Sequence, residues 1–257
     1  MKILLTGHNG FIGSHMLKAL SGHEVATYEW GDTYRHGVMG FDWVIHLGAI
    51  SSTTERDIEK VLTQNLDFSI NLYDECKTFG VNFQYASSAS IYGLVSTFSE
   101  DAPPDPRTPY AWSKYLFERY VRTHPSGSIV QGFRYFNVYG PDGEGHKGSQ
   151  ASPYYQFAKQ AKETNSIKLF KNSDKYLRDF IHVDELVATQ LKFLNVKESG
   201  IWNVGTGNTK SFADVAKTFN VKLIEIPMPA ILTDSYQKYT CADRTKLNET
   251  LAKLNEF

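Results

Sequence analysis

Residues 2–13 read KILLTGHNGFIG, and this stretch gives the strongest indication of the fold class. The apolar run at 2–6 predicts a buried strand, and the pattern at 11–20 predicts a helix. Between them, three glycines in the spacing G-x-x-G-x-x-G allow a tight turn and a close backbone approach to a pyrophosphate. The stretch therefore predicts a dinucleotide site formed by Gly7, Asn9, Gly10, Phe11, Ile12 and Gly13.

Strand and helix patterns go on alternating along the chain. Further strands are predicted at 24–28, 43–47, 83–86, 128–133 and 202–204, and helices at 54–65, 66–78, 109–123 and 183–196. This alternation is typical of an α/β fold with a doubly wound parallel Rossmann sheet. After residue 140 the pattern is mixed, with helices predicted at 152–164 and 211–218 and strands at 167–170 and 222–225. We therefore predict a dinucleotide-binding domain at 1–140 and 179–207, and a smaller C-terminal substrate-binding lobe at 141–178 and 208–257.

Composition excludes several classes of function. The 257 residues carry 27 basic and 28 acidic side chains, a balance that predicts neither a nucleic-acid partner nor a membrane surface. Cys76 and Cys241 lie outside any metal-type spacing, so neither a metal site nor a disulfide framework is expected. The chain has no apolar run long enough to span a bilayer, and a cytoplasmic protein is expected.

The end of the second predicted strand carries Glu29, where an acidic residue can bind the adenosine ribose of a dinucleotide. Its carboxylate would repel a 2′-phosphate, which favours NAD. Arg35 lies nearby and could pair with such a phosphate, so the cofactor is predicted to be NAD or NADP. The alternative for Glu29 is a solvated acidic residue in a loop.

A tyrosine and a lysine share one face of the helix predicted at 109–123. Tyr110 and Lys114 are spaced i, i+4, so the ammonium group can lower the pKa of the phenol and hold the nicotinamide ribose. The resulting tyrosinate would serve as a general base. Ser88, in YASSASIYG, would end a strand beside the cofactor and bond the reacting oxygen. Each feature alone also fits a structural role, as a packed aromatic, a surface lysine or a turn serine.

The chain resembles the extended short-chain dehydrogenase/reductase superfamily, because the glycine loop, Ser88 and the Tyr/Lys pair follow one another in that superfamily's order. Members of this superfamily modify nucleotide-activated sugars. DWVIHLGA at 42–49 is similar to that family's cofactor-lining strand, and RDFIHVDELV and WNVGTG to its later landmarks. The resemblance implies that Leu47, Gly48, Ala49 and Asn65 also bind the cofactor. It implies a homo-oligomer as well, with helix faces around 116–120 packed against a second copy.

Within the superfamily, SSTTE at 51–55 and GHKGSQAS at 145–152 resemble the branch of ADP-glycero-manno-heptose 6-epimerases. An epimerase at an exocyclic carbon removes hydride from one face and returns it to the other, so it needs an acid/base group for each orientation of the sugar. The resemblance assigns these roles to Tyr110 and Lys147. The main alternative for Lys147 is a phosphate-binding lysine. Sugar and diphosphate ligands would be Ser51, Asn137, His146, Ser149, Arg178 and Tyr236.

The sequence departs from this family at two places. Only WGDTYRHGVMGF separates Glu29 from Asp42, which is too short for the further strand and helix that family members carry there. One edge strand is therefore expected to be missing, and a final helix is expected to be trimmed after LNETLAKLNEF. The open alternatives are an epimerase or reductase for another nucleotide sugar and a non-catalytic dinucleotide-binding regulator. SSASIYG lacks the Asp-Glu pair that dehydratases place after the serine.

Overall fold

The computed structural model describes residues 1–257 except 33–36, 142, 230–236 and 256–257, and describes residues 146, 149 and 255 without their side chains. Its main sheet is parallel and has six strands in the order β2-β1-β3-β4-β5-β9. The predicted parallel α/β sheet is confirmed. The strands are β1 (Lys2–Thr6), β2 (Glu24–Tyr28), β3 (Trp43–His46), β4 (Asn82–Ser88), β5 (Val130–Tyr135) and β9 (Gly200–Val204).

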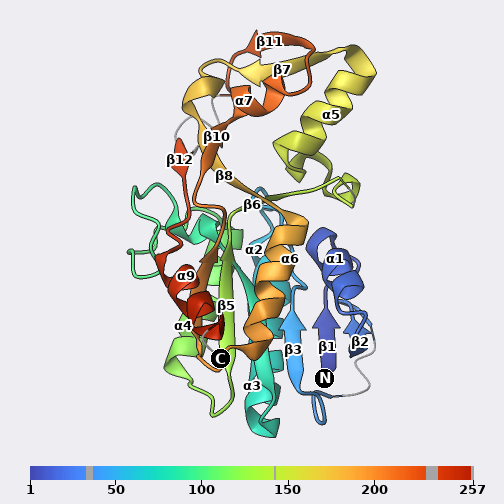
Figure 1. Ribbon diagram of the computed structural model, residues 1–257, viewed down its shortest axis with the longest axis vertical. Coiled ribbons are helices and arrows are strands. Elements are labelled where there is room, and N and C mark those ends of the chain that lie inside the picture. Colours follow the sequence, from blue (N-terminus) through green and yellow to red (C-terminus); the bar gives the residue numbers. More distant parts are fainter. Residues whose placement is uncertain (33–36, 142, 230–236, 256–257) are drawn as a thin grey trace.

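Helices cover both faces of this sheet (Figure 1). One face packs against α1 (Phe11–Ala19) and α6 (Val183–Lys192) in a core that includes Ile3, Leu5 and Phe133. The other face packs against α3 (Phe68–Phe79) and α4 (Pro109–Thr123), around Val44, Phe83 and Phe117. The helix predicted at 54–65 begins later, at α2 (Ile58–Val61), where Asp57 caps the backbone of Lys60, and continues as the π-helix η1 (Leu62–Asp67).

Strand β2 forms the edge of the sheet, and its residues are only partly covered. In the connection from Tyr28 to Trp43, the parts described, 29–32 and 37–42, contain neither strand nor helix. This agrees with the expected loss of one edge strand and its helix.

A second group of elements lies beyond the carboxyl ends of the strands, at the top of Figure 1. It contains α5 (Pro153–Thr164), β7 (Ser166–Phe170), α7 (Phe212–Lys217) and β11 (Lys222–Ile226), and β7 pairs with β11. Its own apolar cluster includes Phe157, Ile167 and Val215. Helix α7 begins with a capping box between Ser211 and Asp214. A serine three residues before an acidic residue favours such a helix start.

Further strands join the two groups. These are β6 (Asn137–Tyr139), β8 (Leu177–His182), β10 (Thr209–Ser211) and β12 (Tyr239–Thr240), with β8 at the centre. The short helical segments are η2 (Ala89–Tyr92), η3 (Gly145–Gln150), η4 (Ser173–Lys175), η5 (Phe193–Asn195) and η6 (Lys253–Asn255). The sequence did not indicate the four joining strands. Strands β6, β10 and β12 are too short to show a period, and β8 mixes buried charged and apolar residues without alternation.

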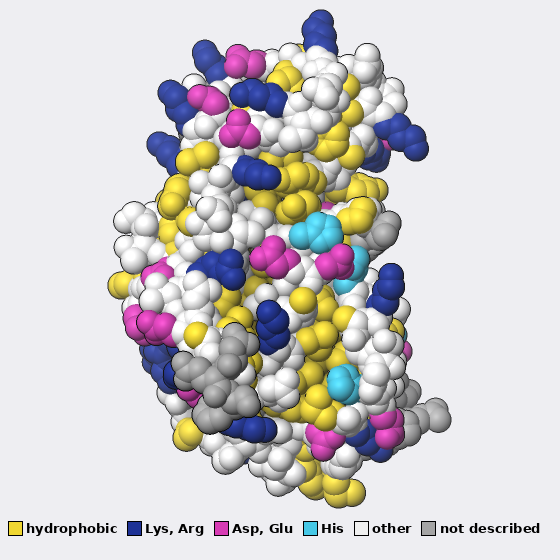
Figure 2. Space-filling model, viewed as in Figure 1, with side chains coloured by type: hydrophobic (Ala, Val, Ile, Leu, Met, Phe, Trp, Pro, Cys, Tyr) yellow, Lys and Arg dark blue, Asp and Glu magenta, His cyan; other side chains and the backbone are white. Residues whose placement is uncertain are grey.

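The last helix, α9 (Thr245–Ala252), packs against the sheet rather than against the second group, and Leu247 is buried in the core around Phe133. It falls inside the range predicted for the substrate lobe, and the domain boundaries themselves stay a prediction. On the face shown in Figure 2, basic and acidic side chains are interspersed. Among the described residues, no helix is long and apolar enough to cross a bilayer.

Candidate active site

A cleft of about 590 Å³ lies where the carboxyl ends of the parallel strands meet the second group of elements. This is the position at which doubly wound sheets bind ligands. The walls come from the glycine loop, the ends of β3, β4 and β5, helix α4, and the segments before α5 and around β12. Predicted site residues on these walls are Gly7, Gly10, Phe11, Ile12, Gly13, Leu47, Ala49, Ser51, Ser88, Tyr110, Lys114, Asn137 and Lys147.

The glycine loop brings strand and helix too close together for side chains. A Cβ on Gly7, whose φ is +76°, would lie 2.5 Å from the backbone nitrogen of Gly48. A Cβ on Gly13 would lie 1.9 Å from the carbonyl oxygen of Gly7. The first-turn amides of α1 have no carbonyl within the helix to bind and lie at its positive end, facing the cleft. These residues fit the pyrophosphate of a dinucleotide.

A smaller hollow of about 190 Å³ lies on the β2 side of this loop, lined in part by Gly48, Tyr28, Trp30 and Phe68. Glu29 also lines it, and one carboxylate oxygen accepts a hydrogen bond of 2.6 Å from the backbone nitrogen of Asn9. The same oxygen lies 3.1 Å from Nδ1 of His8. Glu29 is thus held beside the glycine loop, where it was predicted to bind ribose. Arg35 lies outside the described residues.

Helix α4 positions the Tyr/Lys pair. Thr108 caps it by accepting a bond of 3.1 Å from the backbone of Ala111, and Pro109 occupies the first turn. Lys114 is buried, and its ammonium donates to the carbonyl oxygen of Ala86 at 2.9 Å. Burial lowers the pKa of Lys114 to about 8, while the carboxylate of Glu118 acts in the opposite direction.

Ser88 ends β4 beside Tyr110, as predicted, and its hydroxyl also caps η2 by accepting from the backbone of Ser90 at 3.1 Å. Burial raises the pKa of Tyr110, and the hydrogen bond with Ser88 partly offsets this. The expected lowering of this pKa by Lys114 is therefore not seen in the protein by itself, because burial is the larger effect. The Nζ of Lys114 lies 6.0 Å from the centre of the Tyr110 ring.

Lys147, on η3, also lines the cleft. Its Nζ lies 4.1 Å from the centre of the Phe11 ring, a cation–π contact with the glycine-loop helix. Burial lowers the pKa of Lys147, and the charge of Glu144 opposes this. Glu144 is fully buried and accepts bonds from Gly140 N at 3.0 Å, Ser152 N at 2.6 Å and Ser152 Oγ at 2.7 Å. This carboxylate ties together both ends of the loop that carries Lys147.

Three predicted ligands, Asn9, Asn65 and Arg178, line neither the cleft nor the smaller hollow beside Glu29. Asn65 is 1% exposed and binds the backbone nitrogen and oxygen of Ile50, at 2.8 and 3.0 Å, and Ser113 Oγ at 3.1 Å. These bonds hold the loop after β3 against α4. Arg178 donates to the carbonyl oxygens of Leu177 and Gln237 and lies over the ring of Phe212. The side chains of His146 and Ser149, and all of Tyr236, lie outside the described residues.

Several polar side chains on the cleft wall were missed by the sequence reasoning. They are Thr53, Ser90, Gln150, Gln237 and Thr240. No spacing rule marks these residues as ligands. Ser90 could have been found, because it lies two residues after Ser88 in the same short segment. In the described part of the chain, no group of three or more His, Cys, Asp or Glu could hold a metal ion.

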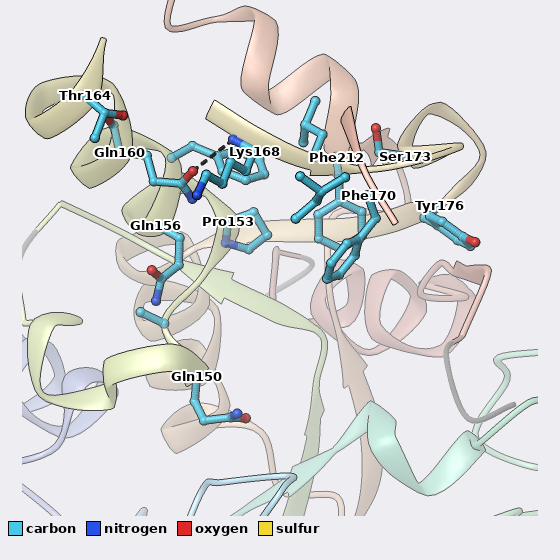
Figure 3. Close-up of a pocket in the computed structure, with 14 residues that line it drawn as sticks. Gln150, Pro153, Gln156, Gln160, Thr164, Lys168, Phe170, Ser173, Tyr176 and Phe212 are labelled. Atoms are coloured by element: carbon cyan, nitrogen blue, oxygen red, sulfur yellow. Dashed lines mark hydrogen bonds between the residues drawn. The ribbon is translucent and has the colours of Figure 1, made fainter. Parts of the chain in front are cut away.

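A second pocket of about 630 Å³ continues from the cleft and shares Gln150, Ala151 and Pro153 with it. Figure 3 shows that Phe170, Tyr176 and Phe212 crowd one end, while Gln156 and Gln160 extend from α5. The side-chain oxygen of Gln160 accepts a bond of 2.9 Å from the backbone of Lys168. The pocket thus offers aromatic faces with a few amide groups, which suits a flat polar ring.

Comparisons with known proteins agree with this geometry. The sequence model of the NAD-dependent epimerase/dehydratase family matches residues 3–205. The ADP-L-glycero-D-manno-heptose-6-epimerase of Helicobacter pylori is 24% identical with a TM-score of 0.87, over 98% of this chain and 90% of that chain. The UDP-glucose 4-epimerase of Thermus thermophilus, solved with NAD, is 26% identical with a TM-score of 0.81, over 97% and 92%. The UDP-N-acetylglucosamine 4-epimerase of Methanobrevibacter ruminantium is 21% identical with a TM-score of 0.88, over 98% and 91%.

Proposed function

The chain belongs to the NAD-dependent epimerase/dehydratase family, enzymes that use NAD or NADP, and from this we propose that it is an ADP-glycero-manno-heptose 6-epimerase. One observation carries the proposal: Tyr110 and Lys147, from α4 and η3, line the same cleft beside the glycine loop. Two acid/base groups around one substrate are what inversion at an exocyclic carbon requires.

The chain's own residues would divide the proton chemistry. A nicotinamide held beside the glycine loop would supply the acceptor of hydride from the sugar carbon and the donor of hydride to its opposite face. Tyr110 takes the hydroxyl proton in one orientation of the sugar, with Ser88 bonded to the same oxygen. Lys114 holds the cofactor ribose, and its low pKa of about 8 lets it exchange a proton near neutral pH. Lys147 protonates or deprotonates the oxygen in the other orientation.

The nucleotide part of the substrate is proposed to bind in the second pocket. Its aromatic end, with Phe170 and Phe212, offers faces on which a base can stack, and Gln156 and Gln160 supply amide groups for its edge. The shared residues Gln150 and Pro153 join it to the cleft, so a diphosphate between them would leave the sugar near Tyr110. We place Asn137 and Ser51 among the sugar ligands because both line the cleft.

A second copy of the chain is proposed to cover the outer face of α3 and α4. A shallow hollow there is lined by Leu66, Ile70, Leu116 and Tyr120, among others, and Leu116 is 37% exposed. An apolar patch of this kind on paired helices suits a symmetric contact between copies.

Replacing Lys147 by alanine is expected to slow exchange between the two heptose epimers by about a hundredfold, because one of the two orientations loses its acid/base group. The fold should be retained, since the backbone and hydroxyl bonds of Glu144, and not the ammonium, tie the two ends of this loop together. The measurement is the initial rate of epimer exchange by NMR. Lys159→Ala, on the exposed side of α5, is the control, and a wild-type rate in Lys147→Ala would exclude the two-base scheme.

Replacing Glu29 by alanine is expected to reduce the preference for NAD over NADP by about tenfold, because the repulsion of a 2′-phosphate is removed. The ratio of the two dissociation constants, measured by calorimetry, tests this. Asp32→Ala is a matched control, since Asp32 accepts from the backbone of Glu29 at 2.8 Å but does not line the hollow. An unchanged ratio in Glu29→Ala would show that Glu29 is not the ribose ligand.

The proposed function is tested by NMR of ADP-D-glycero-D-manno-heptose incubated with purified protein and no added reductant. Appearance of the L-glycero epimer supports both the substrate and the redox-neutral reaction. An unchanged spectrum, from protein that holds cofactor, would direct the same assay to UDP-hexoses.

A further inference from the structure

Two buried hydroxyl groups in the cleft have no hydrogen-bond partner among the residues that the structure describes. These are Ser90 Oγ and Thr240 Oγ1, and the whole Thr240 residue is only 2% exposed. Both residues line the cleft. Nearly all buried polar groups in proteins are hydrogen-bonded, because an unpaired one loses its bonds to water without replacement. Two such groups on one wall therefore point to a ligand that completes them.

The protein holds this wall rigidly from both sides. Ala89 and Ala242 pack in one apolar cluster with Phe136, which joins the segment after β4 to the segment after β12. The backbone of Ala242 donates to the buried Asp179 at 3.0 Å. Thr240 itself pairs with Arg178 in the β12–β8 ladder. The backbone that carries the two hydroxyls is thus anchored in the protein itself, which lowers the cost of ordering this wall when a ligand binds.

The chemistry of the wall selects the kind of group it can hold. A hydroxyl both donates and accepts, so it matches another hydroxyl, as sugars carry. Among the described residues, the charged side chains that line the cleft are two lysines, Lys114 beside Tyr110 and Lys147 beside Phe11. A carboxylate buried against Ser90 and Thr240 would lack a cation of its own, which is costly. The wall favours uncharged, hydroxylated groups.

We propose that Ser90 and Thr240 form a subsite that binds hydroxyl groups of the substrate sugar and so sets its specificity. This rests on the proposed function in that the cleft holds a nucleotide sugar, and it names two specificity-determining residues for that sugar. The free protein keeps the two hydroxyls unpaired at a cost in stability, and the substrate supplies the missing bonds.

Thr240→Val tests the subsite because valine has the same shape without the hydroxyl. The variant is expected to unfold about 2 °C higher than the wild type, since a buried unpaired group is gone. Its KM for ADP-D-glycero-D-manno-heptose should rise about tenfold, while its dissociation constant for ADP, which lacks the heptose, stays unchanged. Ser90→Ala is expected to show the same three effects on unfolding temperature, KM and ADP binding.

The control is Thr250→Val. Thr250 is also buried, but its hydroxyl accepts from Trp202 Nε1 at 2.9 Å and donates to Lys246 O at 2.8 Å, so this variant should unfold at a lower temperature. The subsite is overturned if Thr240→Val unfolds at a lower temperature than the wild type, as this control should, or if its KM is unchanged.

If the protein does not turn over the heptose, the proposed function fails. The subsite is then tested by comparing the dissociation constants of UDP-glucose and of UDP for the wild type and for Thr240→Val. Weaker binding of UDP-glucose alone supports it, and equal effects on both ligands overturn it.

Discussion

Turnover is expected to fall by about a thousandfold when Tyr110 is replaced by phenylalanine, while the dinucleotide stays bound. The hydroxyl of Tyr110 lies at the cleft next to Ser88, and the rest of its ring is packed in α4. Removing one oxygen takes away the group that accepts the substrate proton and leaves the glycine loop and Lys114 in place. The phenylalanine ring fills the same space, so the fold should keep its stability.

Two readouts separate chemistry from binding in this variant. Epimer exchange is followed by NMR, and retained dinucleotide is measured by absorbance after gel filtration. Tyr115→Phe is the matched control, because Tyr115 lies on the same helix, contacts the ring of Trp112 and does not line the cleft. If Tyr110→Phe exchanges the epimers at the wild-type rate, another group must be the base and the assignment of the pair is wrong.

The local parts of this site could be predicted from sequence, and the non-local parts could not. The glycine loop and the pair on α4 depend on neighbours within a few residues, so spacing alone places them on a loop and on one helix face. Thr240 reaches the cleft only because β12 pairs with β8, a contact of two residue pairs that leaves no pattern in the chain. Only the folded protein suggests a role for its hydroxyl, which has no hydrogen-bond partner among the described residues.

Arg178 and Asn65 make contacts that the resemblance did not indicate. The resemblance implies that both are ligands, which stays a prediction, and both side chains form hydrogen bonds with neighbouring backbone. Asn65 lies in the π-helix η1, where the widened turn directs its amide to Ile50 and Ser113. Ser113 in turn donates to the carbonyl oxygen of Tyr110 at 2.8 Å. Asn65 therefore acts on the site through the backbone of α4, which a motif cannot reveal.

Under the Tyr/Lys pair lies a buried ion pair that the sequence did not indicate. Arg134 on β5 donates from Nη2 and Nε to the two carboxylate oxygens of Glu118 on α4, at 2.6 and 3.0 Å. The two side chains are 3% and 2% exposed. Ser87, just before Ser88, also donates to Glu118, at 2.6 Å. This network fixes the register of α4 against β4 and β5, and so the distance from Lys114 to Ser88.

Replacing Arg134 by methionine is expected to destabilise the fold by about 3–5 kcal/mol, because Glu118 would be left as an unpaired buried charge. The midpoint of thermal unfolding should fall by about 10 °C. The exposed pair of Lys253 and Glu198, at 2.8 Å with side chains 60% and 51% exposed, provides the control. Lys253→Met should change stability by less than about 1 kcal/mol.

The double variant Arg134→Met with Glu118→Leu separates the charge from the packing. With both charges gone, the desolvation penalty disappears, and much of the lost stability should return, although Ser87 loses its acceptor. Turnover should not return with it, because the bidentate bonds that set the register of α4 are still missing. If Arg134→Met unfolds within about 2 °C of the wild type, Glu118 is not an uncompensated charge in that variant, and the pair cannot be what holds α4 in place.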